Sequence, residues 1–152
     1  MAGIIVGVDG SDHSRRALAW AMREAVKHHL PLTVMSVHPP APRPATSIYW
    51  GVHSYPENSF DPEIARGAVQ QFVDKVAGEI GEAPEITVSV GTGDVAEELV
   101  KASQGADMLV VGSRGEGGFA RLLMGSVSSQ VVHHALCPVV VIRGPARPHS
   151  QR

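Results

Sequence analysis

The sequence predicts an α/β domain in which helices cover both faces of a five-stranded parallel sheet. Short apolar runs rich in β-branched residues alternate with segments of helical periodicity. Three of these runs are almost continuously apolar, which is typical of strands buried on both faces. The chain has 152 residues, of which 43% are hydrophobic and 18% charged, and this suits one domain with a full core.

The expected strands are five apolar runs, at residues 3–9, 32–37, 86–90, 108–111 and 139–142. Four segments between them repeat apolar residues every three or four positions, as the buried face of a helix does. In chain order these apolar faces are Ala17, Leu18, Ala21, Met22, Ala25 and Val26; Ile64, Ala68, Phe72, Val73, Val76 and Ile80; Val95, Leu99 and Val100; and Val127, Val131, Val132, Ala135 and Leu136. Thr87 and Ser89 alternate with apolar residues, and we expect the third and fifth strands at the sheet edges.

Two segments lie outside this pattern. The stretch from Pro39 to Pro62 holds six prolines together with Tyr49, Trp50 and Tyr55, and we expect a long loop inserted into the domain. This loop is either a flexible insertion, or its aromatic residues cap a ligand or a partner. Residues 144–152 form a short polar tail that we expect to be flexible. The domain itself is expected to span residues 1–143.

Charge and composition exclude several classes of protein. A formal net charge of -2 gives no basic surface for a nucleic-acid backbone. No apolar run approaches the roughly 20 residues of a membrane helix, and residues 1–6 resemble a first strand rather than a signal peptide. Cys137 stands alone, which rules out an internal disulfide and fits a reducing compartment. We therefore expect a cytoplasmic protein.

The most informative segment runs from Val110 to Ser129. A buried strand ends at Gly112, a glycine-rich stretch follows, and Gly125-Ser126 opens a helix. The first N–H groups of a helix lack internal partners and the helix dipole adds positive charge, so such junctions bind phosphate. Glycines let the backbone approach an anion, and Ser126 and Ser128 add hydroxyl groups.

Spacing alone leaves a plainer interpretation open, in which Gly112 and Gly115 serve turn geometry and Ser126 is an ordinary N-cap. The segment is not a Walker A loop, because it has no Gly-Lys-Ser/Thr sequence. It is not a dinucleotide-binding fingerprint either, because its glycines are spread over a long stretch.

The spacing Gly112-x2-Gly115-x9-Gly125-Ser126 resembles the ATP-binding signature of the universal stress protein family. The resemblance extends to Val6-Gly7-Val8-Asp9-Gly10-Ser11, to residues 106–115 and to the closing run 137–143. It implies a sheet ordered 3-2-1-4-5, in which the first and fourth strands are neighbours and a crevice opens at their carboxyl ends. It also implies a homodimer that pairs through residues 139–143.

The resemblance further implies a set of nucleotide contacts. Asp9 would face the adenosine, Val37 would offer backbone groups to the adenine edge, and Val111 and Gly112 would line the ribose. Arg114 and Gly115 would lie along the phosphates. Gly125, Ser126, Val127 and Ser128 would close around them. A Mg or Mn ion is expected to bridge the phosphates.

Several of these and other residues have competing interpretations. Asp9-Gly10-Ser11 is also common turn chemistry, and Ser11 or Asp12 could cap the first helix. The adjacent pairs His28-His29 and His133-His134 project in different directions on a helix and are interpreted as surface residues rather than metal ligands. Cys137 is expected to be buried and inert.

The sequence thus favours an ATP-binding regulatory protein of the stress response over an enzyme, and leaves room for an unidentified protein partner. No serine lies in a hydrolase elbow, and no second aspartate follows the third strand as a receiver-type site would need. Phosphoryl transfer needs a positioned nucleophile and a base, and beyond Asp9 no base is evident. The alternative is a slow ATPase or a nucleotidyl-transferring enzyme on the same scaffold.

Overall fold

The computed structural model describes residues 3–39, 60–114 and 124–144. Within them five strands and four helices follow one another as expected. The strands are β1 (Ile4–Gly7), β2 (Leu32–His38), β3 (Ile86–Thr92), β4 (Met108–Gly112) and β5 (Val139–Ile142). The helices are α1 (Asp12–His28), α3 (Pro62–Ile80), α4 (Val95–Ser103) and α5 (Ser126–His134). None of these helices combines the length and the apolar character needed to cross a bilayer.

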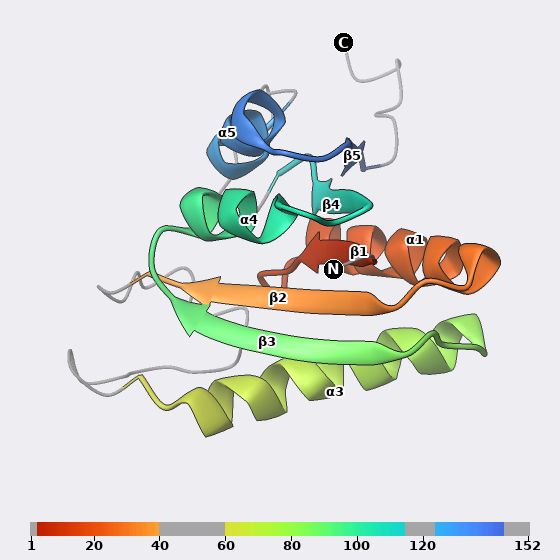
Figure 1. Cartoon of the computed structure of the whole chain (residues 1–152). Coiled ribbons are helices and arrows are strands. Elements are labelled where there is room, and N and C mark those ends of the chain that lie inside the picture. Colours follow the sequence, from red (N-terminus) through yellow and green to blue (C-terminus); the bar gives the residue numbers. More distant parts are fainter. Residues whose placement is uncertain (1–2, 40–59, 115–123, 145–152) are drawn as a thin grey trace, which may run out of the picture.

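The five strands form one parallel sheet in the order β3-β2-β1-β4-β5, which confirms the implied order (Figure 1). Central β1 pairs on both sides, with Ile4 in register with Leu32 of β2 and with Met108 of β4. β3 and β5 are the two edges, as the sequence predicts. Periodicity had predicted the strands, but only this pairing pattern fixes their neighbours.

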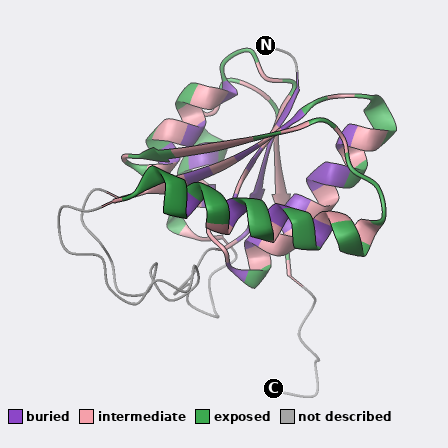
Figure 2. Cartoon of the chain, turned by 90° about the horizontal axis from the view of Figure 1, so that it is seen from below, coloured by how far each residue is buried: buried purple, intermediate pink, exposed green. Residues whose placement is uncertain are grey.

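Helices cover both faces of the sheet and divide the core in two. α1 and α3 pack on one face, where Leu18, Val34 and Val73 belong to a single buried cluster. α4 and α5 pack on the other face, where Leu99 and Val131 are buried. Figure 2 shows the consequence for α3, whose outer side is exposed while its inner side faces the sheet. The molecule therefore has three layers.

Side chains of the residues just before α1, α3 and α4 cap these three helices. Ser11 caps α1 by accepting from the Ser14 N–H, and Asp94 caps α4 by accepting from the Glu97 N–H. Asp61 caps α3, and Pro62 is its first helical residue, where a missing N–H costs nothing. The expected 39–62 loop therefore ends at Asp61. Residues 40–59 of it, and the tail beyond Gly144, lie outside the described residues.

Three apolar residues that the sequence places on buried helix faces are exposed: Ile64 by 54%, Val132 by 46% and Leu136 by 65%. The buried stripe of α3 runs through Ala65 and Val69, and Ile64 lies one position off it. Likewise, Val131 and not Val132 faces the core of α5. Leu136 leaves the helical register because α5 ends at His134.

α1 and β4 approach each other so closely that Gly112 has no room for a side chain. A Cβ built on Gly112 would lie 3.0 Å from the His13 carbonyl oxygen and 3.1 Å from its carbonyl carbon. Both are backbone atoms of the first turn of α1, and they cannot rotate away. Glycine at this position therefore serves the packing of a helix against a strand end.

We expect Gly112→Ala to lower the free energy of unfolding by about 1–3 kcal/mol, because the methyl group overpacks a backbone contact. Gly91→Ala in β3 is the matched control, since a Cβ at Gly91 meets nothing within 4 Å. That change should be neutral or stabilising by up to about 1 kcal/mol. Urea denaturation measures both. Equal effects of the two substitutions would contradict this role of Gly112.

Candidate functional site

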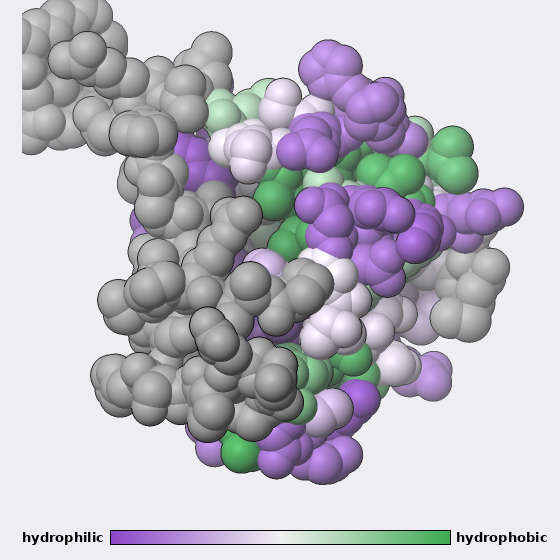
Figure 3. Space-filling view, turned by 90° about the vertical axis from the view of Figure 1, so that its left-hand side faces the viewer, coloured by the Kyte–Doolittle hydropathy of each residue, from purple (hydrophilic) through white to green (hydrophobic). Residues whose placement is uncertain are grey.

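The candidate site lies at the edge of the sheet where the strands end. Because all five strands are parallel, their carboxyl ends share one edge. At that edge the chain leaves β1 for α1 on one face, while α5, the helix after β4, covers the other face, which makes a topological switch between β1 and β4. Figure 3 views the molecule from this side, and polar and apolar side chains of the described residues are mixed on it.

Asp9 follows β1 and shapes the turn into α1. Its Oδ1 accepts a hydrogen bond of 2.9 Å from the Ser11 N–H, and Ser11 in turn caps the helix. The turn interpretation of Asp9-Gly10-Ser11 is thus confirmed. The Asp9 side chain is half-buried, and its contact with a ligand stays a prediction.

Val37 lies near the end of β2, beyond the last rung that β2 shares with β1. That rung is the 2.9 Å hydrogen bond from the Val8 N–H to the Met35 carbonyl. Residues two apart in a strand direct their backbone groups to the same side, so the N–H and C=O of Val37 face the same direction as those of Met35. No further rung of this ladder joins Val37 to another described residue. One donor and one acceptor are therefore presented at the end of β1.

The first turn of α5 has no side-chain cap. Its N-cap is Gly125, in extended conformation, and Ser126 is the first helical residue, so the interpretation of Ser126 as N-cap is wrong. The first backbone bond of the helix runs from the Ser129 N–H to the Gly125 carbonyl at 3.0 Å. The amides of Ser126, Val127 and Ser128 precede that bond and have neither helical nor capping partners within the described residues.

The Ser128 hydroxyl is directed into the protein, although the glycine–serine segment predicts that it contacts a ligand. Ser128 is 3% exposed, and its Oγ lies 2.9 Å from the Ser113 carbonyl and 3.1 Å from the Gly125 carbonyl. The Gly125 N–H also donates to the Ser113 carbonyl. Ser126, by contrast, is exposed.

Ser113 is a site residue that sequence reasoning missed. Its carbonyl holds the start of α5, and its own N–H donates to the Ile142 carbonyl at the end of β5 over 2.8 Å. The residue is 3% exposed. Its place directly after Gly112 in the glycine–serine segment was the available signal.

The remaining predicted residues extend the same edge. Val111 is buried in β4 and pairs in register with Val141 of β5, and Arg114 lies two residues past the end of β4, half-buried. Gly115 lies outside the described residues. The structure thus gathers the predicted residues into two groups on either side of the β1–β4 boundary. Asp9 and Val37 form one group, and Val111 to Arg114 with Gly125 to Ser128 form the other.

His38 is a second residue that the sequence analysis did not single out. It ends β2, its ring lies 4.9 Å from that of Phe60, and its Nε2 is 3.1 Å from the Ser36 hydroxyl. Burial lowers the pKa of His38 below its ordinary value of 6.5. The neutral ring is therefore the form that fits the folded protein.

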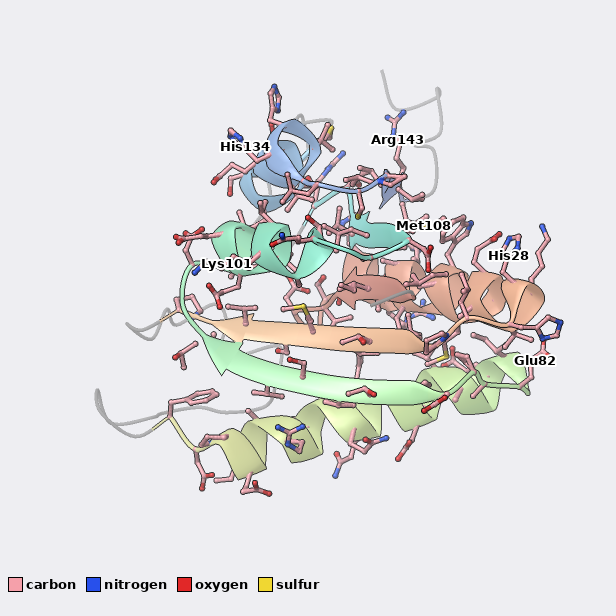
Figure 4. The ribbon with its side chains drawn as sticks, viewed as in Figure 1. His28, Glu82, Lys101, Met108, His134 and Arg143 are labelled. Carbon is pink, nitrogen blue, oxygen red and sulfur yellow. The ribbon has the colours of Figure 1, made fainter. Side chains whose placement is uncertain are left out.

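No group of three potential metal ligands exists among the described residues. Figure 4 shows His28 and His134 pointing outward at opposite ends of the molecule. Cys137 is half-buried rather than buried. Burial and the negative charge of Asp107 raise the pKa of its thiol, so the unreactive protonated form dominates at neutral pH.

We expect the free energy of unfolding to fall as the pH drops below about 6.5. The unfolded chain then binds a proton at His38, while the folded protein resists it until the pH reaches its lower pKa. His38→Phe keeps a ring against Phe60 and removes the titrating group, so this part of the pH dependence should disappear. Urea unfolding between pH 7.5 and 5.5 measures it, with exposed His134→Gln as control. A slope that His38→Phe leaves unchanged would assign the effect to other groups.

Comparisons with known proteins place this geometry in a family. Residues 2–143 match the model of the universal stress protein family. A universal stress protein of Mycolicibacterium smegmatis is 40% identical over 146 residues, which cover 93% of this chain and 48% of that protein. The chain therefore spans about half the length of the curated relatives it matches.

Solved structures agree with the sequence match. The universal stress protein UspA of Lactobacillus plantarum has a TM-score of 0.72 at 26% identity, covering 93% of this chain and 97% of that one. A universal stress protein in complex with cAMP has a TM-score of 0.61 at 26% identity, covering 93% and 95%. One from Archaeoglobus fulgidus in complex with dAMP has a TM-score of 0.61 at 25% identity, covering 93% and 98%. On its sequence and its fold, the chain belongs to the universal stress protein family.

Proposed function

We propose that the chain binds ATP as a regulatory ligand at the switch between β1 and β4, in the cytoplasm and as part of a stress response. The observation that carries the proposal is the first turn of α5. Among the described helices α1, α3 and α4 have side-chain caps, whereas α5 begins at a glycine with no side-chain cap. Its amides and the positive end of its dipole suit a phosphate group.

The backbone donor and acceptor on the other side of the switch suit adenine. The Watson–Crick edge of adenine presents an N1 acceptor and an N6 amino donor, which complement the N–H and C=O of Val37. Guanine presents the opposite order at the same atoms, so the site should prefer ATP to GTP. Asp9 would meet the ribose from β1, and Val111 and Gly112 from β4.

The phosphates would extend from Arg114 and Gly115 to the first turn of α5. There the amides of Ser126, Val127 and Ser128 donate, while the Ser128 hydroxyl stays with Ser113. A Mg or Mn ion would supply charge neutralisation to the triphosphate. The two relatives whose structures contain cAMP and dAMP support an adenine nucleotide as the ligand class. The third phosphate and the metal are our extension of it.

We propose regulation rather than catalysis because hydrolysis needs a positioned base, and the sequence offers no clear base beyond Asp9. One carboxylate oxygen of Asp9, Oδ1, already accepts from the Ser11 N–H and helps to form the turn into α1. A turnover rate of about 10 per second, typical of enzymes, would overturn this part of the proposal in favour of the ATPase or nucleotidyl-transfer alternative.

We expect Gly125→Asp to weaken ATP binding strongly while leaving the fold intact. Aspartate is a favoured N-cap, so unfolding free energy should stay equal or rise by a few tenths of a kcal/mol. The same carboxylate would occupy the amides and repel the phosphates. Losing two charge-assisted hydrogen bonds of about 1.5–3 kcal/mol each weakens binding by about 150-fold or more. Calorimetry with Mg-ATP measures the affinity.

Gly125→Ala is the control, because it adds neither an acceptor nor a charge. It should be less stable than Gly125→Asp and yet bind ATP more tightly, so that stability and affinity change in opposite directions. Wild-type affinity in a folded Gly125→Asp protein would place the phosphates elsewhere. Equal affinity of the wild type for GTP would contradict the contacts assigned to Val37.

We further propose a two-fold dimer through β5, because the two sheet edges differ. Glu85 O accepts from the Leu32 N–H, so the odd-numbered residues of β3 face β2 and the even-numbered ones face the free edge. Arg66 of α3 covers that edge by donating from Nη1 to the Val88 carbonyl at 2.6 Å. An edge carbonyl held in this way is not available to another strand.

At β5 the free edge has no such cover from a described residue. The Leu109 N–H donates to the Pro138 carbonyl at 2.9 Å, so even-numbered residues face β4. Val139 and Val141 therefore direct their backbone groups outward, between apolar side chains that are only partly buried. A second copy of β5, running antiparallel across a two-fold axis, would satisfy these groups.

We expect Val141→Pro to give a folded monomer, because it removes an outward N–H and leaves the ladder to β4 complete. Val140→Pro is the contrasting variant. It removes an N–H that faces β4 and should destabilise the fold itself. Analytical ultracentrifugation and circular dichroism separate the two effects. A wild-type protein that sediments as a monomer at high concentration would refute the dimer.

A further inference from the structure

The two halves of the proposed function meet at Ser113. Its N–H donates to Ile142, the last residue of β5, and its carbonyl accepts from the Gly125 N–H and the Ser128 hydroxyl. Both Ser113 and Ser128 are 3% exposed, so water does not compete for these bonds. One buried residue therefore links the turn that would hold the phosphates to the strand that would pair with a second copy.

α5 is suited to transmit a change from the turn that would hold the phosphates to β5. It has nine residues, of which only Ser128 and Val131 are buried. Its first turn is held by two hydrogen bonds to the carbonyl of Ser113, the residue after β4, while its far end leads within five residues to β5. A short helix with few buried side chains is held firmly only where such bonds fix it.

We propose that the Ser113–Ser128 hydrogen bond couples nucleotide binding to dimerisation, with Ser128 as the positioning residue. This inference rests on the proposed function for both the ligand and the interface. Phosphates bound to the amides of the first turn hold Gly125 and Ser128 against the Ser113 carbonyl. Ser113 is then fixed, and its N–H holds the end of β5 in the position that pairing requires. Ordering that end beforehand lowers the entropy that the dimer must lose.

Because coupling is reciprocal, one coupling free energy describes both directions. Saturating Mg-ATP should lower the dimer dissociation constant of the wild type by about 5-fold or more. Since each dimer would bind two ATP molecules, dimerisation should tighten ATP binding at each site by the square root of that factor. Sedimentation over a range of protein concentrations, with and without Mg-ATP, measures the first. Calorimetry at low and high protein concentration measures the second.

Ser128→Ala tests the positioning role. It removes the hydroxyl but keeps the backbone amide that is proposed to donate to the phosphates, so the ATP affinity and the dimer constant of the variant are each measured before the two dimer constants are compared. The factor between the two dimer constants should fall, since one of the two bonds that hold the first turn of α5 to Ser113 is lost and only the bond from the Gly125 N–H is left. Ser128→Thr keeps a hydroxyl and should restore the factor. Ser129→Ala, one residue on and outside the Ser113 junction, should behave as wild type. A merely structural role of Ser128 would change stability and leave the factor unaltered.

The outcomes distinguish a failure of this inference from a failure of the proposed function on which it rests. Absence of ATP binding in the wild type would defeat the proposed function first. ATP binding without any dimer would overturn the proposed dimer and the coupling with it. A dimer constant that ATP does not change would overturn the coupling alone. A Ser128→Ala protein that keeps the full wild-type factor would also overturn it. If that variant does not fold, the wild-type measurements with and without Mg-ATP still decide.

Discussion

Parallel pairing of β1 with β4 is the constraint on which the rest of the structure depends. It joins the half that contains β2 and β3 to the half that contains β5, and its register sets Val6 beside fully buried Val110. Because the two strands end together while α1 and α5 cover opposite faces, Asp9 and Gly112 come to the same edge. The absence of a side chain at Gly112 is part of this constraint, since α1 packs directly on the end of β4.

Local sequence patterns predicted the helices and strands well, but they did not predict which strands are neighbours in the sheet. Buried parallel strands are almost continuously apolar, and this pattern can be found in a sequence. Thr87 and Ser89 marked an edge strand because one face of β3 meets water. Strand order came only through the family resemblance, since periodicity carries no information on neighbours. The role of Val37 likewise came only through the resemblance, and Ser113 was missed. Each depends on where an adjacent strand ends, which is a long-range property of the fold.

Under the proposed function, the capping pattern sets ligand binding against stability at one helix. Ser11, Asp61 and Asp94 satisfy the first amides of their own helices. A favourable cap is worth about 0.5–2 kcal/mol, and at Gly125 the chain does without it. An anion bound to those amides would replace the missing cap, so that ligand binding stabilises the helix it contacts. The sequence showed the glycine here, but the helix boundary was needed to show that Gly125 and not Ser126 is the N-cap.

The two edges of the sheet are not equivalent with respect to this helix. β3 lies two strands from β1, and its free edge is covered by Arg66 from α3, on the face opposite α5. β5 is the strand whose last carbonyl accepts from Ser113, and Ser113 holds the first turn of α5. A ligand that orders α5 would therefore act on the β5 edge, and the described residues offer it no comparable path to β3. The edge that we propose for pairing is thus the one that a phosphate bound at α5 would reach through hydrogen bonds.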